Sequence, residues 1–161
     1  AMAKVGCRTL YVPLPVQAFH RAGASVGTAT DGIFQVITMA DAGASNLYTS
    51  FRLPAEWDSG TCVLSIYWKT TVVTGNALFT VDVASKAIGG TTALEETVTV
   101  ITAAETTASK INKSQVTFLA ADFTALDLVG IKITRDGTAA SDTLASSLSF
   151  VGAAFEFTGR G

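Results

Sequence analysis

Hydrophobic and polar residues alternate with a period of two along most of the chain. Over residues 61–70, every second position belongs to one apolar face: Cys62, Leu64, Ile66 and Trp68. Because successive side chains of a β-strand point to opposite faces, this pattern predicts a half-buried strand. Similar patterns predict about nine strands in all, at 9–14, 32–38, 46–53, 61–70, 77–84, 97–103, 115–119, 128–134 and 148–158.

Helical patterns are hard to find in the sequence. Val, Ile and Thr are frequent, sustained apolar spacing of three and four residues is missing, and only 120–126 is Ala-rich enough for one short helical turn. Gly, Ser, Asn and Asp lie at the corners between strands, as at 54–60 and 74–76. The sequence therefore predicts an all-β protein, an antiparallel two-sheet β-sandwich of the jelly-roll type with eight to nine strands.

The length of 161 residues is that of one domain. Within it we expect an N-terminal arm with the first strand at 1–30 and the sandwich at 31–161. The formal net charge is −2, with no run of either sign, so we expect neither a nucleic acid nor a membrane surface as a partner. The apolar stretches are too short for a spanning helix and no export signal begins the chain, so we expect a soluble protein.

Reactive residues are few. Ser25 lies in Gly23–Gly27, which matches the G-x-S-x-G pattern of hydrolases, but no strand–helix context surrounds it and His20, the only histidine, precedes the serine. One histidine and two distant cysteines, Cys7 and Cys62, do not make a zinc site, and they leave open whether the cysteines form a disulfide. The turn at 136–142 has too few carboxylates for a dedicated calcium loop. We expect no enzyme, no catalytic residue, no metal and no cofactor.

Aromatic side chains offer a different kind of site, because an aromatic ring can cover the apolar side of a sugar. Trp68 falls on an apolar face and is expected in the core. Trp57 lies in a turn, where it either covers one end of the sandwich or is exposed. Tyr48 and Tyr67 fall opposite the apolar stripes, so we expect them at the surface or in contact with another subunit.

Three segments resemble a known family. These are 48–57 with Phe51-Arg52-Leu53-Pro54, 64–68 with Ile66-Tyr67-Trp68, and 131–144 with Arg135-Asp136-Gly137 followed by Asp142-Thr143. In this order they resemble a jelly-roll domain of tailed-bacteriophage virion structural proteins. The resemblance covers about 30–158. The segment before Asp31 shows no family signal, and Pro13 and Pro15 within it suggest an arm that clasps a neighbouring subunit.

The resemblance implies a non-enzymatic virion protein, either a capsid decoration protein or a head-fibre or tail-fibre module. Its expected partners are other virion proteins, and it is expected to assemble as a homo-oligomer, a trimer. The alternative is a carbohydrate-binding or receptor-binding module with a glycan as its ligand. Under both interpretations, function resides in surfaces, and the candidate contact residues are Trp57, Tyr48, Tyr67, Pro13 and Pro15.

Overall fold

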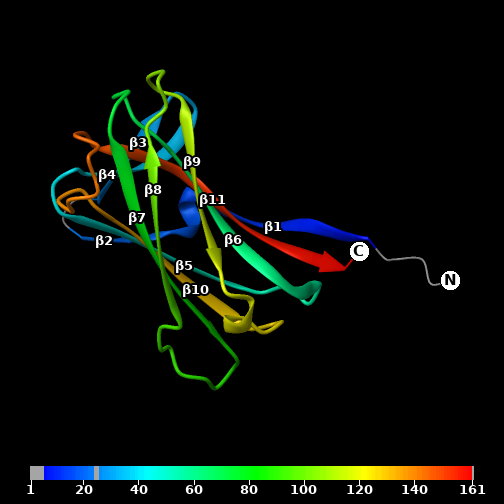
Figure 1. Cartoon of the computed structure of the whole chain (residues 1–161). Coiled ribbons are helices and arrows are strands. Elements are labelled where there is room, and N and C mark those ends of the chain that lie inside the picture. Colours follow the sequence, from blue (N-terminus) through cyan, green and yellow to red (C-terminus); the bar gives the residue numbers. More distant parts are fainter. Residues whose placement is uncertain (1–5, 24–25, 161) are drawn as a thin grey trace.

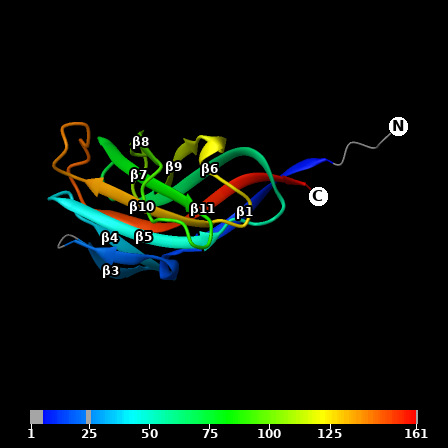
Figure 2. The same cartoon turned by 90° about the horizontal axis from the view of Figure 1, so that it is seen from below.

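Two antiparallel sheets pack face to face in the computed structural model, which describes residues 6–23 and 26–160 (Figures 1 and 2). Two short 3-10 helices, η1 (Val16–Ala18) and η2 (Ala120–Asp122), interrupt the strands. The strands are β1 (Cys7–Pro15), β2 (His20–Ala22), β3 (Val26–Asp31), β4 (Phe34–Met39), β5 (Ala44–Arg52), β6 (Trp57–Lys69), β7 (Asn76–Lys86), β8 (Glu96–Ala103), β9 (Ile111–Phe118), β10 (Leu128–Asp136) and β11 (Leu148–Arg160).

The sheets have different sizes. The six-stranded sheet has the order β3-β4-β11-β6-β9, and β1 also pairs with β11; the five-stranded sheet has the order β2-β5-β10-β7-β8. Strands β8 and β9 bring one edge of each sheet together, and Ser114 Oγ donates a hydrogen bond to Thr102 Oγ1 at 2.7 Å there. The two sheets, in which every strand pairing is antiparallel, confirm the predicted two-sheet antiparallel sandwich.

Each of the nine predicted strands has a counterpart in the structure, and the helical turn predicted within 120–126 corresponds to η2. Strands β2 and β3 were not predicted, because β2 has only three residues, β3 consists mainly of Gly, Ala and Thr, and neither contains clear hydrophobic alternation. Strand β1 pairs along β11, β2 pairs with β5 and β3 pairs with β4. The described part of the segment before Asp31 therefore pairs with both sheets, and β1 is the first strand that was expected within 1–30. That this segment clasps a neighbouring subunit stays a prediction.

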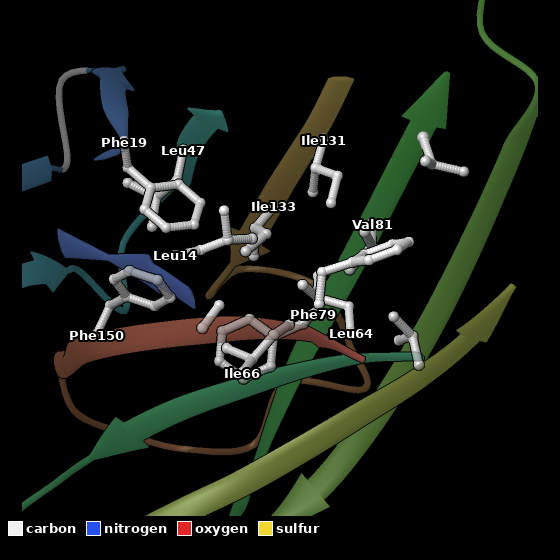
Figure 3. Packing of buried hydrophobic residues seen from close by; sticks show 14 of the residues in the cluster. Leu14, Phe19, Leu47, Leu64, Ile66, Phe79, Val81, Ile131, Ile133 and Phe150 are labelled. Carbon is white, nitrogen blue, oxygen red and sulfur yellow. The ribbon is translucent and has the colours of Figure 1, made fainter. Parts of the chain in front are cut away.

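Inward-facing side chains of both sheets form one core (Figure 3). The apolar face predicted over 61–70 is fully buried, and Trp68 packs against Phe79 with ring centroids 6.0 Å apart. The Trp68 indole N–H donates a hydrogen bond to Ser114 Oγ at 2.9 Å, so the one polar atom of this ring is satisfied in the interior. The core is thus occupied by structural packing, and the outer faces and loops are left for function.

A buried ion pair holds the connection between β10 and β11 against the end of the sandwich. Arg135 and Asp142 have fully buried side chains and pair in a bidentate geometry, Nε–Oδ2 and Nη2–Oδ1 both at 3.0 Å. The remaining guanidinium N–H groups donate to the backbone oxygens of Met39, Ser146 and Leu144. Thr143 Oγ1 accepts a hydrogen bond from the backbone N–H of Asn76 at 2.9 Å. The Arg135 and Asp142-Thr143 motifs are therefore structural.

Within the described part of the chain, no helix has the length and apolar character needed to span a membrane.

Candidate functional site

Trp57, one of the predicted contact residues, is buried. Its side chain is 8% exposed, its indole N–H donates to the backbone oxygen of Gly60 at 3.0 Å, and its ring meets Phe123 edge-on at 6.4 Å between centroids. A ring enclosed in this way cannot serve as an exposed platform, so the interpretation of Trp57 as a surface contact is wrong. The indole instead covers one end of the sandwich, which was the other interpretation.

The remaining contact candidates lie on opposite sides of the molecule. Tyr48 is 41% exposed on the outer face of the five-stranded sheet. Tyr67, half-buried, and Pro13 and Pro15, both exposed, belong to the six-stranded sheet. These residues do not converge on one site, and their contact with other virion proteins stays a prediction.

The candidates for chemistry do not form a reactive centre among the described residues. Ser25 lies outside the described residues. His20 is exposed and pairs in register with Tyr48. Cys62 is a free thiol, and burial raises its pKa to about 12, which keeps it protonated and unreactive. No group of three or more His, Cys, Asp or Glu side chains within residues 6–23 and 26–160 could hold a metal ion.

The turn at 136–142 has a structural role as well. Asp142 is committed to Arg135, and Asp136 accepts hydrogen bonds from both the hydroxyl and the backbone N–H of Thr138, at 2.6 and 3.0 Å. These hydrogen bonds hold the pKa of Asp136 below its usual value. Both carboxylates thus stabilise the connection itself.

The outer face of the five-stranded sheet, in contrast, is hollowed into a groove of about 640 Å³. Strands β5, β10 and β7 supply its floor, and the connection between β7 and β8 borders it. Figure 1 shows this connection, in green, extending beyond the end of the sheet at the bottom of the view. The volume is within the range of about 300–1,000 Å³ that is typical of small-molecule sites.

Small side chains make the floor of the groove. Gly130 on β10 pairs with Ser50 of β5 on one side and with Ala84 of β7 on the other, which gives a row of three small residues across three strands. A Cβ atom added at Gly130 would meet no atom within 4 Å. The space above this glycine is therefore open, and the small-residue row (Ser50, Gly130, Ala84) leaves the floor lower than the rows beside it.

One neighbouring row is polar and contains an aromatic ring. Tyr48, Lys132, Asp82 and Thr97 are register partners across β5, β10, β7 and β8. Lys132 Nζ forms an ion pair with Asp82 Oδ2 at 3.5 Å, and Thr97 Oγ1 donates a hydrogen bond to Asp82 Oδ1 at 2.7 Å. This polar row places a tyrosine ring beside charged donors and acceptors at one side of the groove.

The other side of the groove is aliphatic. The row that flanks the small-residue row on this side contains Leu128, which is 54% exposed and pairs in register with Lys86. Ile88 and Leu94 belong to the β7–β8 connection, line the groove and are 89% and 58% exposed. Such large apolar side chains are costly to leave in water, and their grouping in one hollow is typical of a binding surface.

Glu95 fixes the β7–β8 connection to the sheet. Its carboxylate accepts a hydrogen bond from the backbone N–H of Ser85 at 2.7 Å and forms an ion pair with Lys86, while its own N–H donates to Val83 at 3.0 Å. Burial acts to raise the pKa of the Glu95 carboxyl, but the hydrogen bonds and the Lys86 charge outweigh it and lower the pKa below the usual value. The deprotonated Glu95 carboxylate thus attaches the β7–β8 connection, which borders the groove, to β7.

Sequence reasoning identified Tyr48 but missed the groove around it. Two signals were present in the sequence. One is Gly130 in the middle of a strand, where a glycine often marks a close approach of another molecule, and the other is the pair of large apolar residues Ile88 and Leu94 in a connection made otherwise mostly of small residues. Neither signal alone specifies a groove, because the groove depends on which strands become neighbours.

No protein-family model matches the sequence, and no curated protein matches it. Solved structures do match the fold. A family 35 carbohydrate-binding module from Clostridium thermocellum superposes with a TM-score of 0.59 at 8% identity, over 90% of this chain and 97% of that one. A CBM35 from Cellvibrio japonicus gives a TM-score of 0.57 at 9% identity, over 94% and 99% of the two chains.

The fold also matches parts of larger enzymes. An isomalto-dextranase from Arthrobacter globiformis, determined with panose, gives a TM-score of 0.60 at 14% identity, and the match covers 91% of this chain but 23% of the enzyme. At these identities the likeness shows the fold alone. This chain therefore has the jelly-roll β-sandwich fold found in carbohydrate-binding modules.

Proposed function

We propose that the protein is a non-catalytic carbohydrate-binding module whose ligand lies in the groove on the outer face of the five-stranded sheet. The observation on which the proposal depends is the groove itself, in which a half-exposed tyrosine, an aliphatic border and a polar row face one open floor. The fold matches, which include two carbohydrate-binding modules, support the same class of function.

The composition of the groove suits a sugar because a pyranose ring has an apolar face and a rim of hydroxyl groups. Tyr48, Leu128, Ile88 and Leu94 supply apolar surface for the ring face. The polar row supplies groups that both donate and accept hydrogen bonds, as hydroxyls require. A site that combines a mostly apolar lining with a few polar groups is the usual form of a small-ligand site.

The proposal replaces a virion role as the main interpretation. Jelly-roll architecture agrees with the resemblance to phage virion proteins, but neither the fold matches described above nor the groove supports a capsid, a fibre or a trimer. Location in a virion and assembly with virion proteins stay predictions.

The first test is glycan-array binding followed by calorimetric titration of the best ligand. Tyr48→Ala is expected to weaken binding about tenfold or more, the effect of removing a central aromatic contact. Tyr11→Ala is the matched control, since Tyr11 is 60% exposed on β1 in the other sheet. Equal binding by the Tyr48→Ala variant and the wild type would place the ligand elsewhere, and the absence of any glycan ligand would refute the proposed function.

A further inference from the structure

The charges around the groove are already paired within the protein. Lys132 pairs with Asp82, and Lys86, the other lysine that lines the groove, pairs with Glu95. Each cation therefore has a carboxylate partner of its own. An acidic ligand would have to compete with these carboxylates for the lysines, and it would gain little attraction from a surface whose local charges cancel.

We infer, on the basis of the proposed function, that the groove selects uncharged oligosaccharides and that the Lys132–Asp82 pair recognises hydroxyl groups on neighbouring carbons of the sugar. At 3.5 Å the pair is an ion pair rather than a short hydrogen bond. An ammonium group has three donors, and a carboxylate has about four acceptor positions. The Lys132 ammonium donors thus lie beside the Asp82 carboxylate acceptors. Two adjacent sugar hydroxyls that each donate one hydrogen bond and accept another require this arrangement.

Thr97 strengthens this arrangement from the far side of Asp82. Its hydroxyl donates to Asp82 Oδ1 at 2.7 Å and leaves Oδ2 as the oxygen facing Lys132. The carboxylate is therefore held in one orientation before any ligand arrives. Hydrogen bonds from a sugar to ionised groups are stronger than those to neutral groups, and fixing the acceptor beforehand lowers the entropy lost on binding.

Arg52 is a cationic residue that lies near the groove but does not line it. It is the register partner of Leu128, and its Nε donates to the backbone oxygen of Leu126 at 3.0 Å. An acidic glycan that used Arg52 would have to extend past Leu128, away from the polar row. Arg52→Gln therefore tests the competing possibility, an acidic ligand bound beside the groove.

The test measures affinity for two groups of probes at two salt concentrations. The uncharged probes are xylohexaose, β-1,3-galactotriose and panose, and the acidic probe is trigalacturonic acid. The inference predicts that at least one uncharged probe binds ten times or more tightly than the acidic one, with less than a twofold change between 50 and 500 mM NaCl, because no net charge is neutralised on binding.

Variants then test the pair. Lys132→Met and Asp82→Asn are each expected to weaken binding of the uncharged probe tenfold or more. Thr97→Val should give a smaller loss, because it removes only the group that orients Asp82. The matched control is Lys113→Met, an exposed lysine on β9 of the other sheet, which should leave affinity unchanged. Thermal unfolding of each variant checks that a loss of binding is not a loss of fold.

The possible results separate the inference from the function that it assumes. Salt-sensitive binding of the acidic probe, abolished by Arg52→Gln, would overturn the inference while a carbohydrate-binding role stands. Binding of an uncharged probe with wild-type affinity by both Lys132→Met and Asp82→Asn would overturn the role of the pair. Failure of every probe and of a wider glycan array would overturn the proposed function and the inference together.

Discussion

Arg135→Met tests the claim that the Arg135 and Asp142-Thr143 motifs are structural. Methionine keeps much of the volume of arginine but removes the charge and five hydrogen bonds, two to Asp142 and one each to the carbonyls of Met39, Ser146 and Leu144. Asp142 would remain buried, with only the backbone N–H groups of Leu78 and Leu144 as partners. An unpaired buried carboxylate is among the most destabilising changes a single substitution can make.

The expected loss is about 4 kcal/mol of unfolding free energy, within the range of roughly 3–5 kcal/mol for removing one partner of a buried ion pair. In urea this corresponds to a midpoint lowered by roughly 1–2 M. Trp57 and Trp68 are both buried, so their fluorescence reports the transition. Arg52→Met is the control, because it removes one hydrogen bond from an exposed arginine and should cost less than about 1 kcal/mol.

A double-mutant cycle isolates the pair itself. Arg135→Met combined with Asp142→Leu removes both charges, so the double variant should be at least about 1.5 kcal/mol more stable than the sum of the two single losses predicts. If Arg135→Met unfolds within about 1 kcal/mol of the wild type, or if the two single effects add, the ion pair does not hold the β10–β11 connection and the reasoning fails.

Three further results are expected. Gly137→Ala should lower the unfolding free energy by more than about 1 kcal/mol, because the added Cβ would lie 2.2 Å from the backbone oxygen of Asp41. Gly130→Ala should leave the urea midpoint unchanged or raise it, because its Cβ would meet no atom within 4 Å. Equal effects of the two substitutions would contradict this account of the packing. In a Cys7→Ser variant, the Cys62 thiol should react with a thiol reagent at neutral pH only after unfolding, since its pKa is raised to about 12; rapid labelling of the folded protein would disagree. Glu95 stabilises the β7–β8 connection fully above its unfolded pKa near 4.5, and this stabilisation is lost as the pH falls through the lowered pKa of the folded state. Hydrogen-exchange protection over 87–95, measured relative to the intrinsic exchange rate at each pH, should decrease over the same range. Glu95→Gln should decrease it already at pH 7, and unchanged protection would refute the attachment.

The strands were the most predictable part of the molecule. The alternation that buries Leu64 and Ile66 is a local property, and it identified β6 directly. Strands β2 and β3 could not be predicted, because their sequences contain little hydrophobic alternation and their conformation depends on pairing with β5 and β4. The burial of Trp57 was equally hard to predict. Trp57 begins β6 rather than lying in a turn, and its ring is covered by Phe123, which is distant in sequence.

The groove could not be predicted from the sequence either, because it depends on contacts between residues that are distant in sequence. Ser50, Gly130 and Ala84 are separated by up to 80 positions and become one row only when β10 inserts between β5 and β7. Tyr48 could be placed on an outer face from periodicity alone. Its neighbours Lys132 and Asp82 could not, because the ion pair depends on the non-sequential strand order.

Filling the groove tests the central claim most directly. Gly130→Leu places a side chain in the open space above the floor, and Gly27→Leu on β3 is the matched control, since a Cβ atom at Gly27 also meets nothing within 4 Å. In calorimetric titration with the best glycan from the array, the account predicts that Gly130→Leu abolishes binding while Gly27→Leu binds like the wild type, with both variants folded. Undiminished binding by the folded Gly130→Leu variant would contradict it.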